Sequence, residues 1–285
     1  MSESGSAADP ATASILVRID GRRRWFPDFS ELFAYRHLVV ILGRRDITTK
    51  YRQTVLGSFW IFTGPLVSAG LFSFVFGRVA DLPSQGVPYF VFSYAGLVAW
   101  NLFVGVLSGS SGSVTSNGAL ISKIYFPRLV IPLYSVVNSL VNLVISFVIL
   151  IVILVISGVG FSAQFVLFPV WLCMGAALGM GLALTFTSAS AWYRDVGYLT
   201  PLITQLLLFL SPVAYSIQAV PANLRDLYLL NPLSTIVEGA RWSFLGTSYL
   251  PPAWAIAYSS ALTLLTLIGG LVVFTRFEGG FADVL

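Results

Sequence analysis

The chain has 285 residues, of which 56% are hydrophobic and only 10% are charged, and its formal net charge is +4. Because a soluble domain carries about 25% charged residues, this composition excludes a soluble globular protein and indicates an integral membrane protein. Nine of the sixteen cations fall within residues 18–52, a placement that suits anionic lipid headgroups, so we expect membrane lipids and no nucleic acid as partners.

Residues 1–28 are expected to form a partly disordered tail, and Trp25 and Phe26 beside three arginines are typical of a membrane interface. The next segment, residues 29–42, predicts an amphipathic helix. Its 14 residues fall short of the roughly 20 apolar residues that a membrane span needs. We therefore expect an interface helix on the cytoplasmic membrane surface, and a short soluble helix packed on a partner is the alternative.

A basic connector follows this helix, and the two together occupy residues 29–57. No residue from Phe59 to Gly77 is charged, whereas cations crowd the chain just before that stretch. Cations next to a span mark its cytoplasmic side. The sequence thus predicts a cytoplasmic interface made of Arg44, Arg45, Asp46, Lys50, Tyr51 and Arg52.

Residues 58–285 predict a transmembrane domain, and the fold class is that of an all-α membrane protein. Six spans are expected, at about Phe59–Gly77, Val87–Leu107, Leu129–Ile156, Phe165–Ala189, Tyr198–Ile217 and Ala253–Thr275. With the N-terminus inside, the inner segments hold 13 of the 16 cations. This asymmetry predicts that both termini are cytoplasmic.

The sequence offers no internal source of energy for transport. No span centre holds a Lys, Arg, Asp or Glu, which argues against proton or sodium coupling. No GxxxxGK[ST] phosphate loop is present, so we expect no cofactor on this chain and place ATP and Mg on a separate ATPase subunit. A single cysteine, Cys173, and a single histidine, His37, also predict no disulfide and no metal site.

Polar and aromatic residues within the spans suggest a substrate path. Ser135, Asn138, Ser139, Asn142 and Ser146 share one face of the third span, where they either bind neighbouring helices or lie beside a hydroxyl-rich substrate. Aromatic rings stack on the C–H faces of sugars, so an aromatic-lined channel would suit a glycan. The predicted path consists of Trp60, Phe72, Trp100, Tyr134, Asn138 and Asn142. In the fourth span, Gly175 and Gly179 predict close helix packing.

A short cytoplasmic loop places apolar and aromatic residues between two cations. Such a compact apolar knob suits a groove on a partner protein, and insertion into the headgroup layer is the alternative. The predicted ATPase-coupling residues are Lys123, Ile124, Tyr125, Phe126, Pro127 and Arg128.

The segment Leu224–Gly246 lies outside by the predicted topology, yet it is rich in apolar residues. Asn231 can cap a helix that begins at Pro232 and stops at Gly246. Glu238 and Arg241 are three residues apart and can pair on one face. We predict an extracytoplasmic re-entrant gate helix with Asn231, Pro232, Glu238 and Arg241 at the exit, and a helix lying flat on the outer surface is the alternative.

Taken in order, several motifs resemble the ABC type-2 exporter permeases that export polysaccharides and teichoic acids. They are Arg45-Asp46 with the run from Lys50 to Gly57 and Trp60, Lys123 to Arg128 (K-x-Y/F-F-P-R), Tyr193-Arg194-Asp195, Ser211-Pro212-Val213 with Tyr215, Asn231-Pro232 with Arg241, and Phe281-Ala282-Asp283.

The resemblance implies a homodimer with two copies of an ATPase subunit in the bacterial cytoplasmic membrane. It implies export of a polysaccharide of O-antigen, teichoic acid or galactan type, linked to polyprenyl diphosphate. It also assigns Asn117–Phe126 to an ATPase-coupling helix and Leu224–Gly246 to helices that close the exit. An ABC type-2 permease for a drug or other lipid, and a membrane glycosyltransferase, are the alternatives. A glycosyltransferase would need clustered acidic residues, whereas Asp20, Asp28 and Asp46 are scattered.

Overall fold

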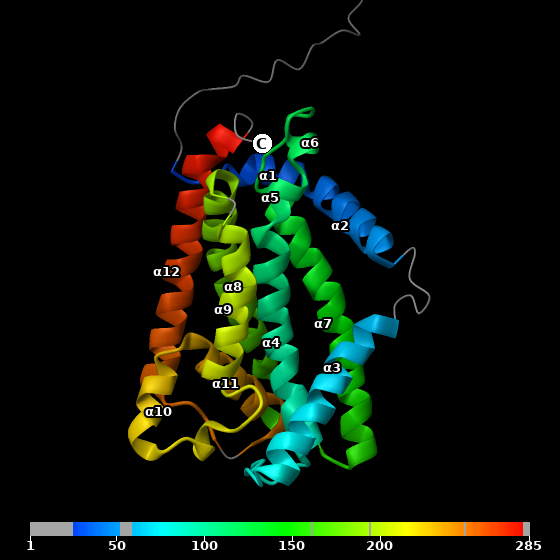
Figure 1. The fold of residues 1–285 in the computed structure, drawn as a ribbon, viewed down its shortest axis with the longest axis vertical. Helices are drawn as coiled ribbons and strands as arrows, with labels where there is room; N and C mark the ends of the chain where they lie inside the picture. Colours follow the sequence, from blue (N-terminus) through cyan, green and yellow to red (C-terminus); the bar gives the residue numbers. More distant parts are fainter. Residues whose placement is uncertain (1–24, 52–58, 161, 194, 248, 282–285) are drawn as a thin grey trace, which may run out of the picture.

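The computed structural model describes residues 25–51, 59–160, 162–193, 195–247 and 249–281, and within these ranges it contains helices and no strand (Figure 1). The long elements are α3 (Phe59–Phe72), α4 (Tyr89–Ser111), α7 (Val130–Ser157), α8 (Phe168–Trp192), α9 (Val196–Leu210) and α12 (Ala253–Phe277). The shorter α-helices are α1 (Phe29–Ala34), α2 (Arg36–Tyr51), α5 (Ser113–Ser116), α6 (Gly118–Ile121), α10 (Ala222–Leu229) and α11 (Pro232–Leu245). Single turns or short helical runs complete the chain: η1 (Ser73–Val79), η2 (Ala163–Leu167), η3 (Ile217–Ala219) and η4 (Glu278–Gly280).

Within the described residues, five helical segments are long and apolar enough to cross a membrane. They are Phe62–Val79, Tyr89–Ser111, Val130–Ser157, Ala163–Trp192 and Ala253–Gly280. These segments match the first four predicted spans and the sixth. The first of them continues from α3 into the π-helical turns of η1, where Gly77 lies against the ring of Tyr89.

The fifth predicted span is shorter than expected. Helix α9 has 15 residues, so it extends about 22 Å, against a hydrocarbon core of about 30 Å. The expectation that this helix continues to Ile217 is wrong, because Ser211 leaves the helix with φ −112° and ψ 144°. Residues before a proline disfavour the helical region, and Pro212 follows.

The predicted interface helix is divided and longer than expected. The chain turns at Tyr35 between α1 and α2, and α2 continues to Tyr51, so most of the predicted basic connector is helical. Asp28 caps α1 by accepting the N–H of Ser30 at 3.0 Å. Helix α2 packs on α7, where Leu42 is buried and Gly43 faces Val137.

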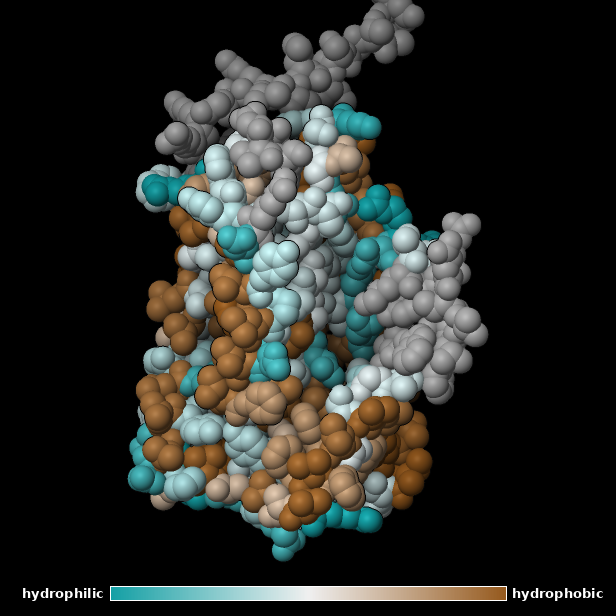
Figure 2. All heavy atoms as spheres, viewed as in Figure 1, coloured by the Kyte–Doolittle hydropathy of each residue, from teal (hydrophilic) through white to brown (hydrophobic). Residues whose placement is uncertain are grey.

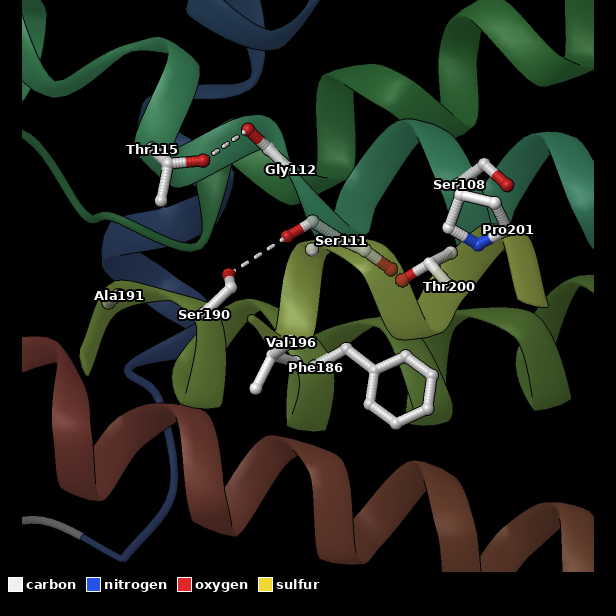
Figure 3. A pocket seen from close by; sticks show the side chains of 11 residues that line it. Ser108, Ser111, Gly112, Thr115, Phe186, Ser190, Ala191, Val196, Thr200 and Pro201 are labelled. Atoms are coloured by element: carbon white, nitrogen blue, oxygen red, sulfur yellow. Dashed lines mark hydrogen bonds between the residues drawn. The ribbon is translucent and has the colours of Figure 1, made fainter. Parts of the chain in front are cut away.

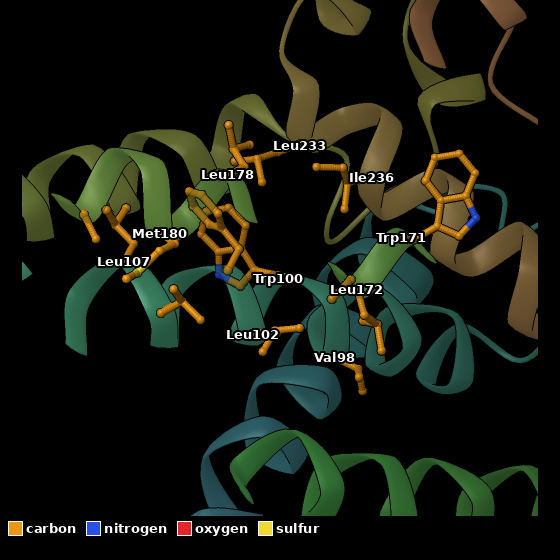
Figure 4. Close-up of a cluster of buried hydrophobic side chains, with 14 of the residues drawn as sticks. Val98, Trp100, Leu102, Leu107, Trp171, Leu172, Leu178, Met180, Leu233 and Ile236 are labelled. Atoms are coloured by element: carbon orange, nitrogen blue, oxygen red, sulfur yellow. The ribbon is translucent and has the colours of Figure 1, made fainter. Parts of the chain in front are cut away.

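Helix α4 forms the centre of the bundle, and residues 91–100 along it are all buried. It packs on α3, α7, α8 and α11. The prediction of close packing is confirmed at Gly179, where a Cβ would lie 2.9 Å from the carbonyl oxygen of Phe103, whereas a Cβ on Gly175 would find only an ordinary contact at 3.6 Å, to Ile236. Figure 4 shows how large side chains fill the remaining space, with Trp100 of α4 beside Leu178 of α8 and near α11.

Part of the outer surface of the bundle is apolar. Figure 2 shows hydrophobic side chains over the flank that α9 and α12 form and around α3. On α9 the exposed side chains include Leu202, Leu206 and Phe209. Such a surface suits the hydrocarbon layer of a membrane.

The two ends of the bundle carry different elements. Helices α1, α5, α6 and the C-terminal end of α12 lie at one end, which we call the α5/α6 end (Figure 1). Helices α10 and α11 lie at the opposite end, which we call the α10/α11 end (Figure 1). The candidate sites lie at these ends.

Candidate functional site

Helix α11 forms as the sequence predicts. The side chain of Asn231 accepts the N–H of Leu233 at 3.1 Å, Pro232 occupies the first turn, and Gly246 closes the helix with φ 65°. Every residue from Leu233 to Arg241 is buried, because α11 packs against α4, α8 and α12. A helix lying flat on an outer surface would expose one face, so this burial counts against that alternative.

The predicted pair of Glu238 and Arg241 is confirmed. Nη1 of Arg241 lies 3.3 Å from Oε1 of Glu238, and both side chains are completely buried. A buried ion pair is stable only when further hydrogen bonds satisfy its remaining donors and acceptors. Glu238 receives one of these from the N–H of Ile217, whose nitrogen lies 2.8 Å from Oε1.

Arg241 makes many more contacts than the ion pair. Its guanidinium donates to the carbonyl oxygens of Phe92 at 3.2 Å, Pro212 at 2.6 Å and Tyr215 at 3.2 Å, and also to that of Val213. Its central carbon lies 3.9 Å from the ring centroid of Phe92, in a cation–π contact. One side chain therefore connects α11, α4 and the irregular segment 211–216.

Gly96 and Asn231 make two further contacts at this site, and sequence reasoning predicted neither contact. A Cβ on Gly96 would lie 2.3 Å from Nη2 of Arg241, so only glycine leaves room for the guanidinium. The amide of Asn231 also donates to Oγ of Ser211 at 2.9 Å and to the carbonyl oxygen of Leu210 at 3.2 Å. The residue that caps α11 therefore also fixes the C-terminal end of α9.

At the α5/α6 end, the predicted coupling loop is only partly as expected. The helix there covers Gly118–Ile121, which is shorter than the coupling helix mapped to Asn117–Phe126. Ile124 and Tyr125 are 58% and 55% exposed, but Phe126 is 5% exposed and belongs to the core, so the expectation of an exposed ring at Phe126 is wrong. Lys123 is exposed, and Pro127 and Arg128 are partly buried.

The environment of Tyr125 keeps its phenol neutral. Desolvation, reinforced by the nearby carboxylate of Glu31 on α1, raises the pKa of Tyr125. A tyrosine hydroxyl is already a hydrogen-bond donor at neutral pH, and the raised pKa extends this to higher pH. Ile124 and Tyr125 together present an apolar surface with one polar tip.

A polar network connects this loop to α2 and α7. Nη2 of Arg45 lies 3.2 Å from Oδ1 of Asn117, and the amide of Asn117 donates to the hydroxyl of Tyr134 at 2.9 Å. Close by, the amide of Asn138 donates to Asp46 at 2.5 Å. The structure thus joins two predicted interface residues to two residues that had been predicted for the substrate path.

The remaining predicted interface residues are Arg44, Lys50, Tyr51 and Arg52. Arg44 is exposed on α2, Lys50 and Tyr51 are described by their backbone in α2, and Arg52 lies outside the described residues.

The predicted substrate path is not gathered into one place in the described part of the chain. Trp100 lies in the core, with its ring 5.7 Å from that of Phe103. Phe72 contacts Phe76 instead, at 5.9 Å. Asn142 is partly buried on α7, and Trp60 is described by its backbone in α3.

The polar stripe on α7 bonds to α4, to α2 and within α7 itself. Oγ of Ser135 donates to the carbonyl oxygen of Gly109 at 2.9 Å, and the hydroxyl of Tyr94 donates to the backbone carbonyl oxygen of Ser146 at 3.3 Å. Ser139 lies against Gly105. The serines therefore support the helix-packing interpretation of the stripe over a substrate contact.

Comparison with known proteins gives consistent results. A model of the ABC-2 type transporter family matches residues 37–245, from α2 to the end of α11. The O-antigen export system permease protein RfbA of Klebsiella pneumoniae is 26% identical over 249 residues, covering 87% of this chain and 95% of the relative. RfbA of Myxococcus xanthus is 26% identical over 255 residues, covering 89% and 97%. The polysialic acid transport protein KpsM of Escherichia coli is 22% identical over 249 residues, covering 84% and 93%.

Proposed function

The chain belongs to the ABC-2 type transporter family, and from this premise we propose that it is the permease subunit of an ATP-driven polysaccharide exporter. The observation that carries the proposal is its similarity to O-antigen export permeases over 87% of its own length and 95% of theirs. The cargo is a glycan of O-antigen, teichoic acid or galactan type on a polyprenyl diphosphate lipid.

The proposed assembly contains two copies of this chain and two ATPase subunits, which bind ATP and Mg. Ile124 and Tyr125 form the docking surface for the ATPase. Their exposure supports this role, because buried aromatic and aliphatic anchors dominate the affinity of many protein interfaces. Asn117 connects this docking surface to α2 and α7.

The proposed topology has six crossings of the bacterial cytoplasmic membrane, with both termini and the α5/α6 end in the cytoplasm. Helix α9 crosses together with the buried segment 211–216 that follows it. Irregular backbone at membrane depth is tolerated where protein satisfies its polar groups, and the bonds from Arg241 to this segment supply that condition. Helices α10 and α11 re-enter from outside and close the exit.

The proposal is tested with the permease purified together with its ATPase subunit in lipid nanodiscs. We expect added polyprenyl-diphosphate-linked glycan to stimulate ATP hydrolysis several-fold. Stimulation by drugs or by lipids without sugar, but not by the glycan lipid, would favour the alternative permease. Transfer of sugar onto an acceptor without ATP would instead favour the glycosyltransferase.

A further inference from the structure

A cavity with a volume of about 540 Å³ lies near the α5/α6 end, between the ends of α4, α8 and α9. Five of its eleven lining residues carry hydroxyl groups, and these come from all three helices and from α5 (Figure 3). The residues that matter for its chemistry are Ser108, Ser111, Thr115, Ser190, Thr200 and Phe186. Binding sites for small molecules commonly have volumes of about 300–1,000 Å³.

Three of the hydroxyl groups in this wall have used their protons within the protein. Ser111 donates to the carbonyl oxygen of Leu107 at 2.5 Å, and Thr115 donates to that of Gly112 at 3.0 Å. Ser190 donates to the carbonyl oxygen of Thr187 at 3.0 Å. Each hydroxyl oxygen keeps lone pairs that can accept, so this part of the wall offers acceptors and suits a ligand that brings donors.

Thr200 differs from these three. Its side chain is 6% exposed, and its Oγ1 has no hydrogen-bond partner in the described part of the chain. Thr204, one turn later on α9, donates to the carbonyl oxygen of Thr200 at 3.0 Å in the ordinary helical manner. Figure 3 shows the hydroxyl of Thr200 directed from α9 toward Ser111 of α4. A buried hydroxyl without a partner is unfavourable, so this geometry calls for a bound group.

The wall favours a neutral ligand over an anionic one. None of the described lining residues is charged. A phosphate carries negative charge, and it would meet no cation among these lining residues to compensate that charge. A sugar carries several hydroxyl donors and an apolar C–H face, for which the ring of Phe186 provides a surface.

We infer that this cavity binds sugar residues of the lipid-linked glycan at the cytoplasmic entrance, with Thr200 as a specificity-determining contact. The inference rests on the proposed function and deepens it, because it separates recognition of the sugar from recognition of the diphosphate and the prenyl chain. The wall includes Gly112 and Thr115, which are close in the chain to Asn117 and lie at the same end of the bundle as the docking surface (Figure 1). Binding at this place is therefore positioned to affect ATP hydrolysis.

The test uses the complete permease–ATPase complex in nanodiscs and two probes. One probe is a polyprenyl diphosphate that carries a single N-acetylglucosamine, and the other is the same lipid without sugar. We expect the wild-type complex to bind the first probe more tightly than the second, and the ratio of the two affinities is its preference. Thr200→Val should reduce that preference about three- to tenfold, the fold-change of one hydrogen bond. Thr200→Ser should restore it.

Thr204→Val is the matched control, because Thr204 lies on the same helix but not in the cavity wall, and it should keep the wild-type preference. Phe186→Leu provides a second variant that should weaken binding of the sugar-bearing probe even if Thr200→Val fails to fold. If Thr200→Val keeps the wild-type preference, or binds both probes more weakly to the same degree, the inference is wrong. The proposed export function would still stand. If neither probe stimulates ATP hydrolysis in the wild type, the proposed function itself fails.

Discussion

Arg241 shows how one side chain can hold together several parts of the chain that are distant in sequence. We expect Arg241→Ala to lower the free energy of unfolding by about 3–5 kcal/mol, because it leaves Glu238 buried without its counter-charge. Export should fall with it, and the resting conductance of the membrane should rise if α11 seals the exit. Thermal unfolding in detergent, export and conductance in liposomes measure the three effects.

Arg225→Ala is the matched control for this change. Arg225 lies at the same end, also donates to backbone carbonyls, at 2.9 Å to Val220 and 2.8 Å to Gln218, and is only partly buried. Its removal should cost much less stability. Wild-type stability, export and conductance in Arg241→Ala would contradict the role given to the ion pair.

Gly96 gives a second prediction at the same place. Gly96→Ala inserts a methyl group 2.3 Å from Nη2 of Arg241, so the guanidinium must shift away from its acceptors. Overpacking of a core typically costs about 1–3 kcal/mol, and we expect a lower melting temperature. Gly269→Ala on α12, where nothing lies within 4 Å of the added Cβ, should keep or raise the melting temperature, because alanine favours the helix. Equal melting temperatures in the two variants would show that the Arg241 site accommodates the added methyl group without loss of stability.

The sequence predicted the parts of this site that depend on neighbouring residues. The cap at Asn231, the stop at Gly246 and the i, i+3 pair all follow from local rules. The acceptors of Arg241 could not be predicted, because Phe92 and Pro212 lie 149 and 29 residues away in the chain. The burial of Phe126 was missed for the same reason, since it depends on tertiary packing.

Among the elements, the loop after α6 carries the clearest prediction of function. Changing both Ile124 and Tyr125 to Ala should weaken binding of the ATPase subunit by about 2–4 kcal/mol, roughly 30- to 1,000-fold, with the permease still folded. Co-purification and titration of the ATPase subunit measure this. Val155→Ala with Ile156→Ala, an even more exposed apolar pair near the far end of α7, should bind normally. Normal affinity and export in the first double variant would exclude docking at this loop.

The sequence predicted which segments are helical better than it predicted where the helices end. Long apolar runs give strong signals, and the helices with those signals appear at the expected places. The division at Tyr35 and the end of α9 at Leu210 depend on individual backbone conformations. Pro212 indicated the end of α9, but the apolar residues that follow Pro212 led to a predicted span that was too long.

For the whole molecule, topology provides the decisive test. Tags at residues 5 and 285 should both be accessible only from the cytoplasm, and a cysteine in place of Asn223 should react with impermeant reagents from outside. Cys173 is exposed and must first be replaced. The expectation follows from the cation asymmetry and from the opposite positions of the α5/α6 and α10/α11 ends (Figure 1). External labelling of either terminus would contradict six crossings.

Arg241 also determines how the segment after α9 would move. The carbonyl groups of Pro212, Val213 and Tyr215 share a single guanidinium, so they lose their partner together when it withdraws. Separate hydrogen bonds would let such a segment fray one residue at a time. We therefore expect these three carbonyl groups to be released together rather than one residue at a time.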